Sequence, residues 1–178
     1  MKWTPIALAS VGLISGASAP LIAHAKIYLS IEQAQKIMFG HTSWNHKPIL
    51  ISDDIQKKMR QASGVSHPFN SHRIWKSTQG AWFIVDEVVG KHEMITYALG
   101  IEADGRIKNI EILEYRESYG YEVGEDSWRK QFMGKTSKSD LKLNKDIQNI
   151  SGATLSAKHL TDGVKRLMIM HKLALQGN

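Results

Sequence analysis

Two segments near the start of the chain carry apolar residues at helical spacing, and each is bounded by a capping residue and a glycine. Ser30-Ile31-Glu32-Gln33 has the form of a capping box, and Gly40 follows the apolar face of the first segment. The second segment begins after Ser52 and ends at Gly64. This pattern predicts two short helices. The stretch between them, which contains Trp44-Asn45-His46, has no clear period and is interpreted as a loop.

From Arg73 onward, runs of β-branched and aromatic residues replace the helical pattern. These runs predict strands over residues 74–76, 81–85, 94–101 and 107–115. Between the last two runs, Asp104-Gly105 favours a tight two-residue turn, because glycine readily supplies the positive φ angles that such a turn needs.

The remaining segments indicate helices that pack on this sheet. Residues 116–145 are rich in glycine, serine and charge, and Trp128, Phe132 and Met133 predict a short amphipathic helix among them. A long last helix is predicted from about Ser156 to Leu175. One stripe of this helix is formed by Leu160, Val164, Leu167, Met168 and His171. The predicted fold class is α+β, a small antiparallel sheet packed with helices, the longest of them C-terminal.

The first 25 residues have the features of a secretory signal peptide. Lys2 precedes the apolar stretch 6–14, and Ala23-His24-Ala25 offers small residues at the positions that a signal peptidase inspects. We therefore expect a signal peptide over residues 1–25 and a single domain over residues 26–178. The expected location is periplasmic or otherwise extracytoplasmic, and membrane association stays open.

Two alternatives to cleavage after Ala25 are weaker. Cleavage after Ala19 would place Pro20 directly beyond the cut, where a rigid ring without an N–H fits a protease cleft poorly. An uncleaved anchor would have an apolar stretch shorter than the ~20 residues that span hydrocarbon.

Composition removes several classes of chemistry. The chain of 178 residues has no cysteine, which excludes disulfides, thiolate metal sites, thiol catalysis and covalent c-type haem. A net charge of +6 favours anionic partners without identifying the anion. The pairs His41 with His46 and His67 with His72 have a spacing that does not suit two metal ligands on one helical face, so we expect no metal site.

Small and hydroxyl-bearing residues gather immediately before the predicted last helix, in Ser151-Gly152-Ala153-Thr154-Leu155-Ser156. Gly152 and Ala153 leave the backbone almost uncovered, and the start of a helix presents unpaired N–H groups that favour an anion. Such a segment suits a phosphate group. It is also what an ordinary Ser or Thr helix cap looks like, and the residues alone leave both interpretations open.

This run, followed by Thr161-Asp162-Gly163-Val164, closely resembles the flavinylation motif of the FMN-binding domain family. The family includes the flavin-carrying subunits of the sodium-translocating NADH:quinone reductase and of the Rnf complex. The resemblance implies that Thr154 is joined through its hydroxyl oxygen to the phosphate of FMN, by a phosphoester that a separate flavin transferase makes after export. It implies no acid or base role for Thr154.

Three looser matches extend the resemblance over most of residues 26–178. Residues 28–34 look like the family's opening helix, 117–122 like its glycine-containing turn near the flavin, and 128–135 like the segment between turn and motif. The resemblance implies FMN contacts from Thr154 and its neighbours Ser151, Gly152, Ala153, Leu155 and Ser156, and from the turn residues Glu117, Ser118, Gly120 and Tyr121.

Two departures from the family pattern stand near this site. Gln148 occupies the position where the family commonly has an aspartate, and Asp146 lies two positions upstream. The family's turn often contains a proline where this chain has Tyr119. Tyr119 or Tyr121 suits either stacking on the flavin ring or ordinary surface packing.

The resemblance implies an exported flavoprotein that carries electrons from a membrane-embedded donor to an extracytoplasmic acceptor. The reactive group would be the flavin, so we expect a carrier domain more than a self-sufficient enzyme. The alternative is a non-redox or non-covalent flavin-binding sensor. Lys130, Lys135 and Lys158 suit either a phosphate contact or a solvated surface. A nucleic-acid partner is not expected, because the positive charges are scattered without an aromatic platform.

Overall fold

One antiparallel sheet of six strands runs through the molecule, in the order β1-β6-β5-β4-β3-β2. The computed structural model describes residues 26–177, so the predicted signal peptide lies outside the described residues. The strands are β1 (Lys26–Ile27), β2 (Trp44–His46), β3 (Ile74–Ser77), β4 (Trp82–Val89), β5 (Met94–Ile101) and β6 (Ile107–Tyr115). Helices cover both faces, which confirms the predicted α+β class.

Both N-terminal helices form between the predicted caps. Helix α1 (Ile31–Phe39) has Ser30 as its N-cap in a complete capping box, and α2 (Asp53–Ser63) has Ser52 as its N-cap. At the end of α2, Gly64 takes the left-handed conformation with φ +76°, which glycine adopts without steric cost. Local sequence therefore fixes where these helices begin and end.

The segment around Trp44 is a strand, and its interpretation as a loop was wrong. Residues 44–46 form β2, which pairs antiparallel with β3 through Trp44 and Ser77. Its Trp44 ring packs edge-on against Phe39 of α1, with 5.0 Å between the ring centroids. Three residues are too few to show a period of two, so only the pairing with β3 makes this segment a strand.

The turn between β5 and β6 is longer than predicted. Gly105 has φ +83°, whereas the φ angle of Asp104 is not positive. A two-residue turn of the expected type needs positive φ at both central positions. Instead Glu102 N–H donates to the carbonyl of Arg106, which closes a three-residue loop, and the register shifts between Gly100 and Ile101.

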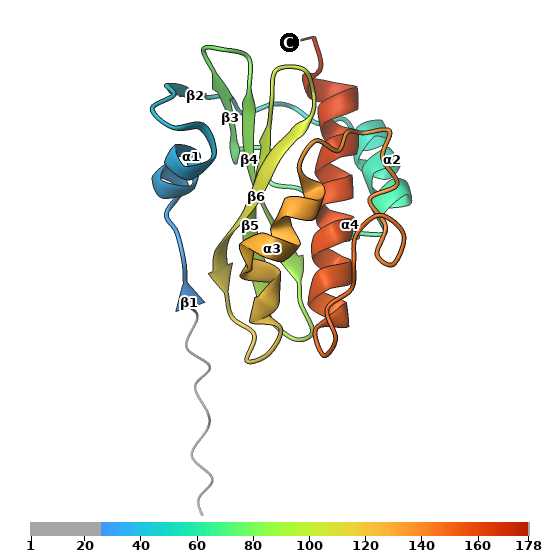
Figure 1. Cartoon of the computed structure of the whole chain (residues 1–178). Coiled ribbons are helices and arrows are strands. Elements are labelled where there is room, and N and C mark those ends of the chain that lie inside the picture. The colour runs from blue at the N-terminus through green and yellow to red at the C-terminus, as the bar shows by residue number, and fades with distance from the viewer. Residues whose placement is uncertain (1–25, 178) are drawn as a thin grey trace, which may run out of the picture.

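Helices pack on both faces of the sheet (Figure 1), each over a cluster of apolar side chains. On one face, α4 (Thr154–Met170) and α2 pack over the larger cluster, to which Leu160, Val164, Leu167 and Met168 belong. On the other face, α1 contributes Ala34 and Met38 to a smaller cluster. The stripe predicted for the last helix is buried as expected, and a π-helical turn over His171–Leu175 continues it.

The segment between β6 and α4 contains three short helical turns. They are a 3-10 turn over Tyr121–Gly124, α3 (Asp126–Arg129) and a second 3-10 turn over Lys130–Phe132. Trp128 and Phe132 are buried as predicted, whereas Met133 is 49% exposed. Arg129 fastens the segment to β6 through an ion pair of 2.6 Å with the buried carboxylate of Glu111. No helix among residues 26–177 has the length and apolarity needed to cross a membrane.

Candidate functional site

Helix α4 begins at Thr154 without a capping side chain. Its N-cap is Ala153, and no side chain of the described residues hydrogen-bonds to the cap position. The preceding turn is closed by Ala153 N–H, which donates to the carbonyl of Ile150 at 3.0 Å, and Gly152 has φ +84° within it. The interpretation of this run as an ordinary Ser or Thr cap is therefore wrong. The first-turn N–H groups are left for an external acceptor, and a helix start favours an anionic one.

The hydroxyl groups of this run have different partners. Thr154 is exposed, and its Oγ1 accepts a hydrogen bond of 3.0 Å from Asn149 Nδ2. Ser156 is buried, and its Oγ lies 3.2 Å from the hydroxyl of Tyr115. Because the Tyr115 hydroxyl donates its proton to the carbonyl of Tyr119, Ser156 is the donor in this contact. Thr154 is thus the accessible hydroxyl at the helix start.

The turn after β6 packs directly against the motif. Gly120 has φ +87°, and a Cβ there would lie 2.8 Å from the Tyr115 hydroxyl and 3.0 Å from the Cβ of Ala153. No larger residue fits between turn and helix at this distance. Burial raises the pKa of the Tyr115 phenol, so this group stays protonated and keeps donating to the carbonyl of Tyr119.

A cavity of about 390 Å³ opens between the turn, the start of α4 and the loop that joins β4 to β5. Most of the residues predicted to contact the cofactor line it, namely Glu117, Ser118, Gly152, Ala153, Thr154, Leu155 and Ser156. The predicted contacts Ser151, Gly120 and Tyr121 do not line it, whereas Tyr119, which is 83% exposed, does.

Lys91 and His92 also line this cavity, and sequence reasoning missed them. Both belong to the short loop between β4 and β5, where charged residues are common for reasons of solvation alone. Nothing in the local pattern marks them. Their place at the cavity follows from strand pairing, which brings the end of β4 beside the turn after β6.

Glu117 holds this loop in place. Its Oε1 accepts hydrogen bonds from the backbone N–H groups of His92 and Glu93, the latter at 2.9 Å. Gly90 permits the approach, because a Cβ there would lie 2.6 Å from the same oxygen. Partial burial alone would raise the pKa of Glu117, but the backbone N–H groups around the carboxylate outweigh it and lower that pKa below its ordinary value. The carboxylate is therefore ionised at neutral pH and bound to the loop.

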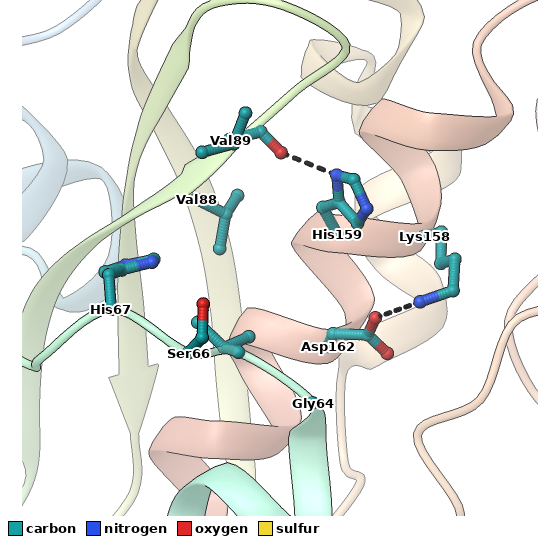
Figure 2. A pocket seen from close by; sticks show the side chains of 9 residues that line it. Gly64, Ser66, His67, Val88, Val89, Lys158, His159 and Asp162 are labelled. Carbon is teal, nitrogen blue, oxygen red and sulfur yellow. Dashed lines mark hydrogen bonds and ion pairs between the residues drawn. The ribbon is translucent and has the colours of Figure 1, made fainter.

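A smaller hollow of about 180 Å³ lies one turn further along α4, and its polar groups bond within the protein (Figure 2). His159 Nδ1 lies 2.7 Å from the carbonyl of Val89 and 3.0 Å from that of Gly90, so the ring can donate to the end of β4. Lys158 pairs with Asp162 at 2.6 Å. This hollow thus contributes a second attachment of the β4–β5 loop, from the side of α4.

The three lysines considered as phosphate contacts all pair with carboxylates. Besides Lys158, Lys130 pairs with Asp126 at 2.5 Å and Lys135 with Asp146 at 3.2 Å. None of the three lines the larger cavity. The solvated-surface interpretation fits Lys130 and Lys158, whereas Lys135 is largely buried in its ion pair. Lys91 is the lysine that the fold places at the cavity.

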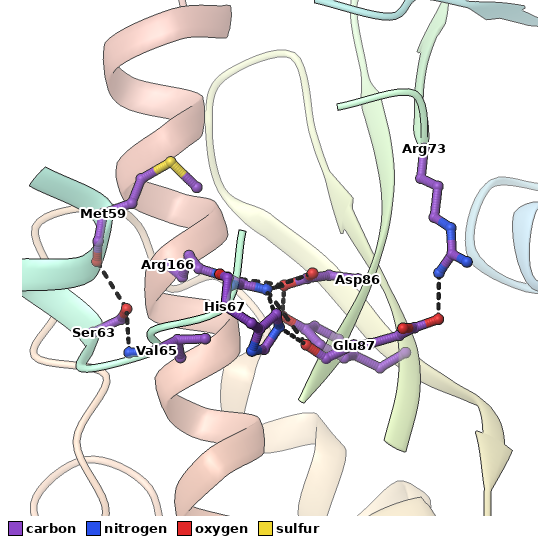
Figure 3. A network of polar contacts seen from close by, with 9 residues as sticks. Met59, Ser63, Val65, His67, Arg73, Asp86, Glu87 and Arg166 are labelled. Carbon is purple, nitrogen blue, oxygen red and sulfur yellow. Dashed lines mark hydrogen bonds and ion pairs between the residues drawn. The ribbon is translucent and has the colours of Figure 1, made fainter. Parts of the chain in front are cut away.

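A buried charge network fixes α4 to the sheet (Figure 3). Arg166 is 1% exposed and donates through Nε to Asp86 of β4 at 3.1 Å and through Nη1 to the carbonyl of His67 at 2.9 Å. The Tyr97 hydroxyl donates to the same carboxylate at 3.0 Å. Burial, reinforced by the Asp86 charge, raises the pKa of Tyr97 well above its ordinary value. The helix that begins at Thr154 is therefore tied to β4 through Arg166.

The residues upstream of the motif are tied to the segment before it. Gln148 N–H donates to Gln131 Oε1 at 2.7 Å, and the Gln148 carbonyl accepts from Trp128 Nε1 at 2.8 Å. The carboxylate of Asp146 accepts from the N–H groups of Leu141 and Lys142, so it is occupied within its own loop. The Gln148 side chain itself is exposed.

Two of the four histidines considered as metal ligands contact backbone carbonyls. His46 Nε2 lies against the carbonyl of His72, and His67 Nε2 lies 2.8 Å from that of Glu87. Within residues 26–177, no group of three or more His, Asp or Glu side chains is placed to hold a metal ion.

Comparison with known proteins identifies the region that forms this site. Residues 90–168 match the FMN-binding domain family. A component of the proton-translocating ferredoxin:NAD(+) oxidoreductase complex of Clostridium ljungdahlii is 26% identical over 131 residues, which cover 67% of this chain and 71% of the relative. The matched region contains every residue that lines the larger cavity. The region that forms the cavity beside Thr154 is therefore similar to FMN-binding domains.

Proposed function

We propose that this protein carries FMN as a phosphoester on Thr154 and acts as an electron carrier. The observation that carries the proposal is the position of the Thr154 hydroxyl, exposed on the first residue of α4 at the edge of a cavity of about 390 Å³ within the region similar to FMN-binding domains. A hydroxyl placed there can be esterified without disturbing the core.

The residues around Thr154 suit a phosphate group. The uncapped start of α4 offers N–H donors, and Lys91 and His92 line the same cavity from the opposite loop. Under the proposal these groups bind the phosphate oxygens of FMN. Leu155 and Tyr119, both exposed at the cavity, offer apolar surface to the flavin ring.

Bound FMN would supply hydride or one-electron chemistry, while the protein contributes position and electrostatics. A covalent link suits a carrier, because the cofactor then stays bound at any concentration of free flavin. The similarity to a component of a ferredoxin:NAD(+) oxidoreductase complex supports a place in an electron-transfer assembly. We therefore propose a membrane-embedded redox partner, export by the signal peptide and maturation by a flavin transferase.

Intact mass tests the attachment. The protein is produced with and without a flavin transferase, and the proposal expects a gain of one FMN less one water only when the transferase is present. Thr154→Ala abolishes this gain, Thr154→Ser retains it, and the exposed-site control Ser127→Ala leaves it unchanged. A wild-type protein that binds flavin without a mass gain would replace the covalent carrier with a non-covalent flavin-binding module.

Reduction tests the carrier role. The flavinylated protein is mixed anaerobically with membranes that contain a reduced donor, and the flavin absorbance is followed. The proposal expects bleaching on reduction and recovery when an acceptor is added. A flavin that membrane donors never reduce would favour the sensor alternative.

A further inference from the structure

The amide of Asn149 has only one orientation that satisfies its neighbours. Its Oδ1 accepts a hydrogen bond of 2.9 Å from the backbone N–H of Ile150. A backbone N–H can only donate, so the oxygen must face it and the NH₂ group must face the other way. The Nδ2 therefore donates to Thr154 Oγ1 at 3.0 Å, and the hydroxyl oxygen is the acceptor in this bond.

This bond fixes the state of the Thr154 hydroxyl. Because one lone pair of Oγ1 accepts from Asn149, the hydroxyl proton points away from the amide and stays available to an external base. An N–H donor also stabilises negative charge on Oγ1 as that proton leaves, in the way that preorganised donors stabilise a developing oxyanion. The amide is thus suited to activating Oγ1 as a nucleophile.

We propose that Asn149 is the residue that orients and activates Thr154 Oγ1 for phosphoester formation. This inference rests on the function proposed above and adds a second residue to the reaction. The Thr154 Oγ1 attacks the flavin-side phosphorus of a flavin dinucleotide, and an oxygen–phosphorus bond forms there. The phosphorus–oxygen bond to the bridging oxygen of the pyrophosphate breaks, a nucleoside monophosphate leaves and the hydroxyl proton passes to a base of the transferase. No group is oxidised or reduced.

The backbone around Asn149 is held from outside the motif. The preceding residue, Gln148, receives a hydrogen bond from the Trp128 indole and donates one to Gln131, so its N–H and its carbonyl are both fixed. Trp128 is itself buried in the core. The Asn149 amide is therefore presented to Thr154 by the folded segment 128–131, which explains why an exposed side chain can hold a defined position.

Time courses of flavinylation test the role of Asn149. Purified protein is incubated with a flavin transferase and flavin dinucleotide, and the fraction modified is read by intact mass. We expect Asn149→Ala and Asn149→Leu to lower the initial rate about tenfold, the effect of losing one hydrogen bond. Long incubation should bring both variants to the wild-type final mass, and the exposed amide control Asn45→Ala should keep the wild-type rate.

Asn149→Asp tests the hydrogen bond to Thr154 Oγ1 separately from the hydrogen bond to the Ile150 N–H. Its carboxylate still accepts from Ile150 N–H but cannot donate to Oγ1 until it is protonated. The rate relative to wild type should therefore be low at neutral pH and rise as pH falls toward the carboxyl pKa. An Asn149→Asp rate equal to or above wild type at neutral pH, or an Asn149→Leu rate equal to wild type, would overturn the inference. Failure of the wild type itself to be modified would instead overturn the proposed function.

Discussion

At the scale of single residues, the Arg166 guanidinium is a side chain on which the stability of the fold depends. It lies in the core, where its charge is balanced by Asp86. Arg166→Met leaves that carboxylate buried without its partner, and loss of one member of a buried pair costs about 3–5 kcal/mol. Urea titration should show this loss of unfolding free energy. The exposed control Lys58→Ala, whose pair with Asp54 lies in solvent, should change it by about 0.5 kcal/mol or less.

Gly120 joins the turn after β6 to the start of α4. An alanine there meets both a backbone conformation that disfavours side chains, with φ +87°, and a Cβ contact of 2.8 Å with the Tyr115 hydroxyl. We expect Gly120→Ala to lower the unfolding free energy by about 1–3 kcal/mol. It should also slow flavinylation, because the added methyl group would push the turn away from the motif that contains Thr154.

Gly134→Ala is the matched control for this prediction. Gly134 has a similar φ of +75°, but nothing lies within 4 Å of a Cβ built on it. This variant therefore meets only the conformational cost, about 1 kcal/mol. Thermal unfolding of both variants measures the difference, and equal losses would show that close packing between Gly120 and α4 contributes nothing.

At the scale of elements, the β4–β5 loop depends on the ionised Glu117 carboxylate. The folded-state pKa of Glu117 lies below the ordinary value, so its bonds to the loop stabilise the fold above the unfolded pKa of about 4.5. That contribution is lost as pH falls through the folded pKa. The wild-type advantage in unfolding free energy over Glu117→Gln should therefore shrink as pH drops below about 4.5.

Denaturant titrations at several pH values measure this advantage. Glu125→Gln serves as the control, because Glu125 is an exposed carboxylate outside the cavity, and its difference from wild type should stay nearly constant. Amide hydrogen exchange should then show faster exchange for residues 91–93 in Glu117→Gln. Unchanged exchange in that loop would mean that its position does not depend on the Glu117 carboxylate.

Elements were predictable where the signal lay within a few residues. Ser30, Ser52 and Gly64 define helix ends through contacts inside their own turns, so sequence alone located α1 and α2. Strand β2 was missed, and the β5–β6 turn was predicted one residue too short, because each depends on strand pairing. Sequence reasoning likewise found the motif side of the cavity and missed Lys91 and His92, which only the closed sheet brings there.

At the scale of the whole molecule, the start of α4, which lines the cavity, and the first described strand lie at the same end (Figure 1). Lys26 pairs with Tyr115, whose hydroxyl contacts Ser156 of the motif, whereas the turn His171–Leu175 lies at the other end of α4. A protein domain fused through a short linker before Lys26 should therefore obstruct the transferase more than one fused after residue 177.

Flavinylation rates of the two fusion proteins test this arrangement. The N-terminal fusion should react more slowly, and a long flexible linker should restore its rate, because distance then relieves the obstruction. Equal rates with short linkers would mean that the transferase approaches α4 from a side that neither terminus obstructs.

The cavity is assembled from the β4–β5 loop, the turn after β6 and the start of α4, which are distant in sequence. It exists only after the strands have paired and the last helix has docked, and contacts of this kind form late when a chain folds. The short motif around Thr154 is present from the moment of synthesis, but its surroundings are not. A flavin bound in the completed cavity would therefore have been attached after folding. Its presence would show that the chain had reached its native state.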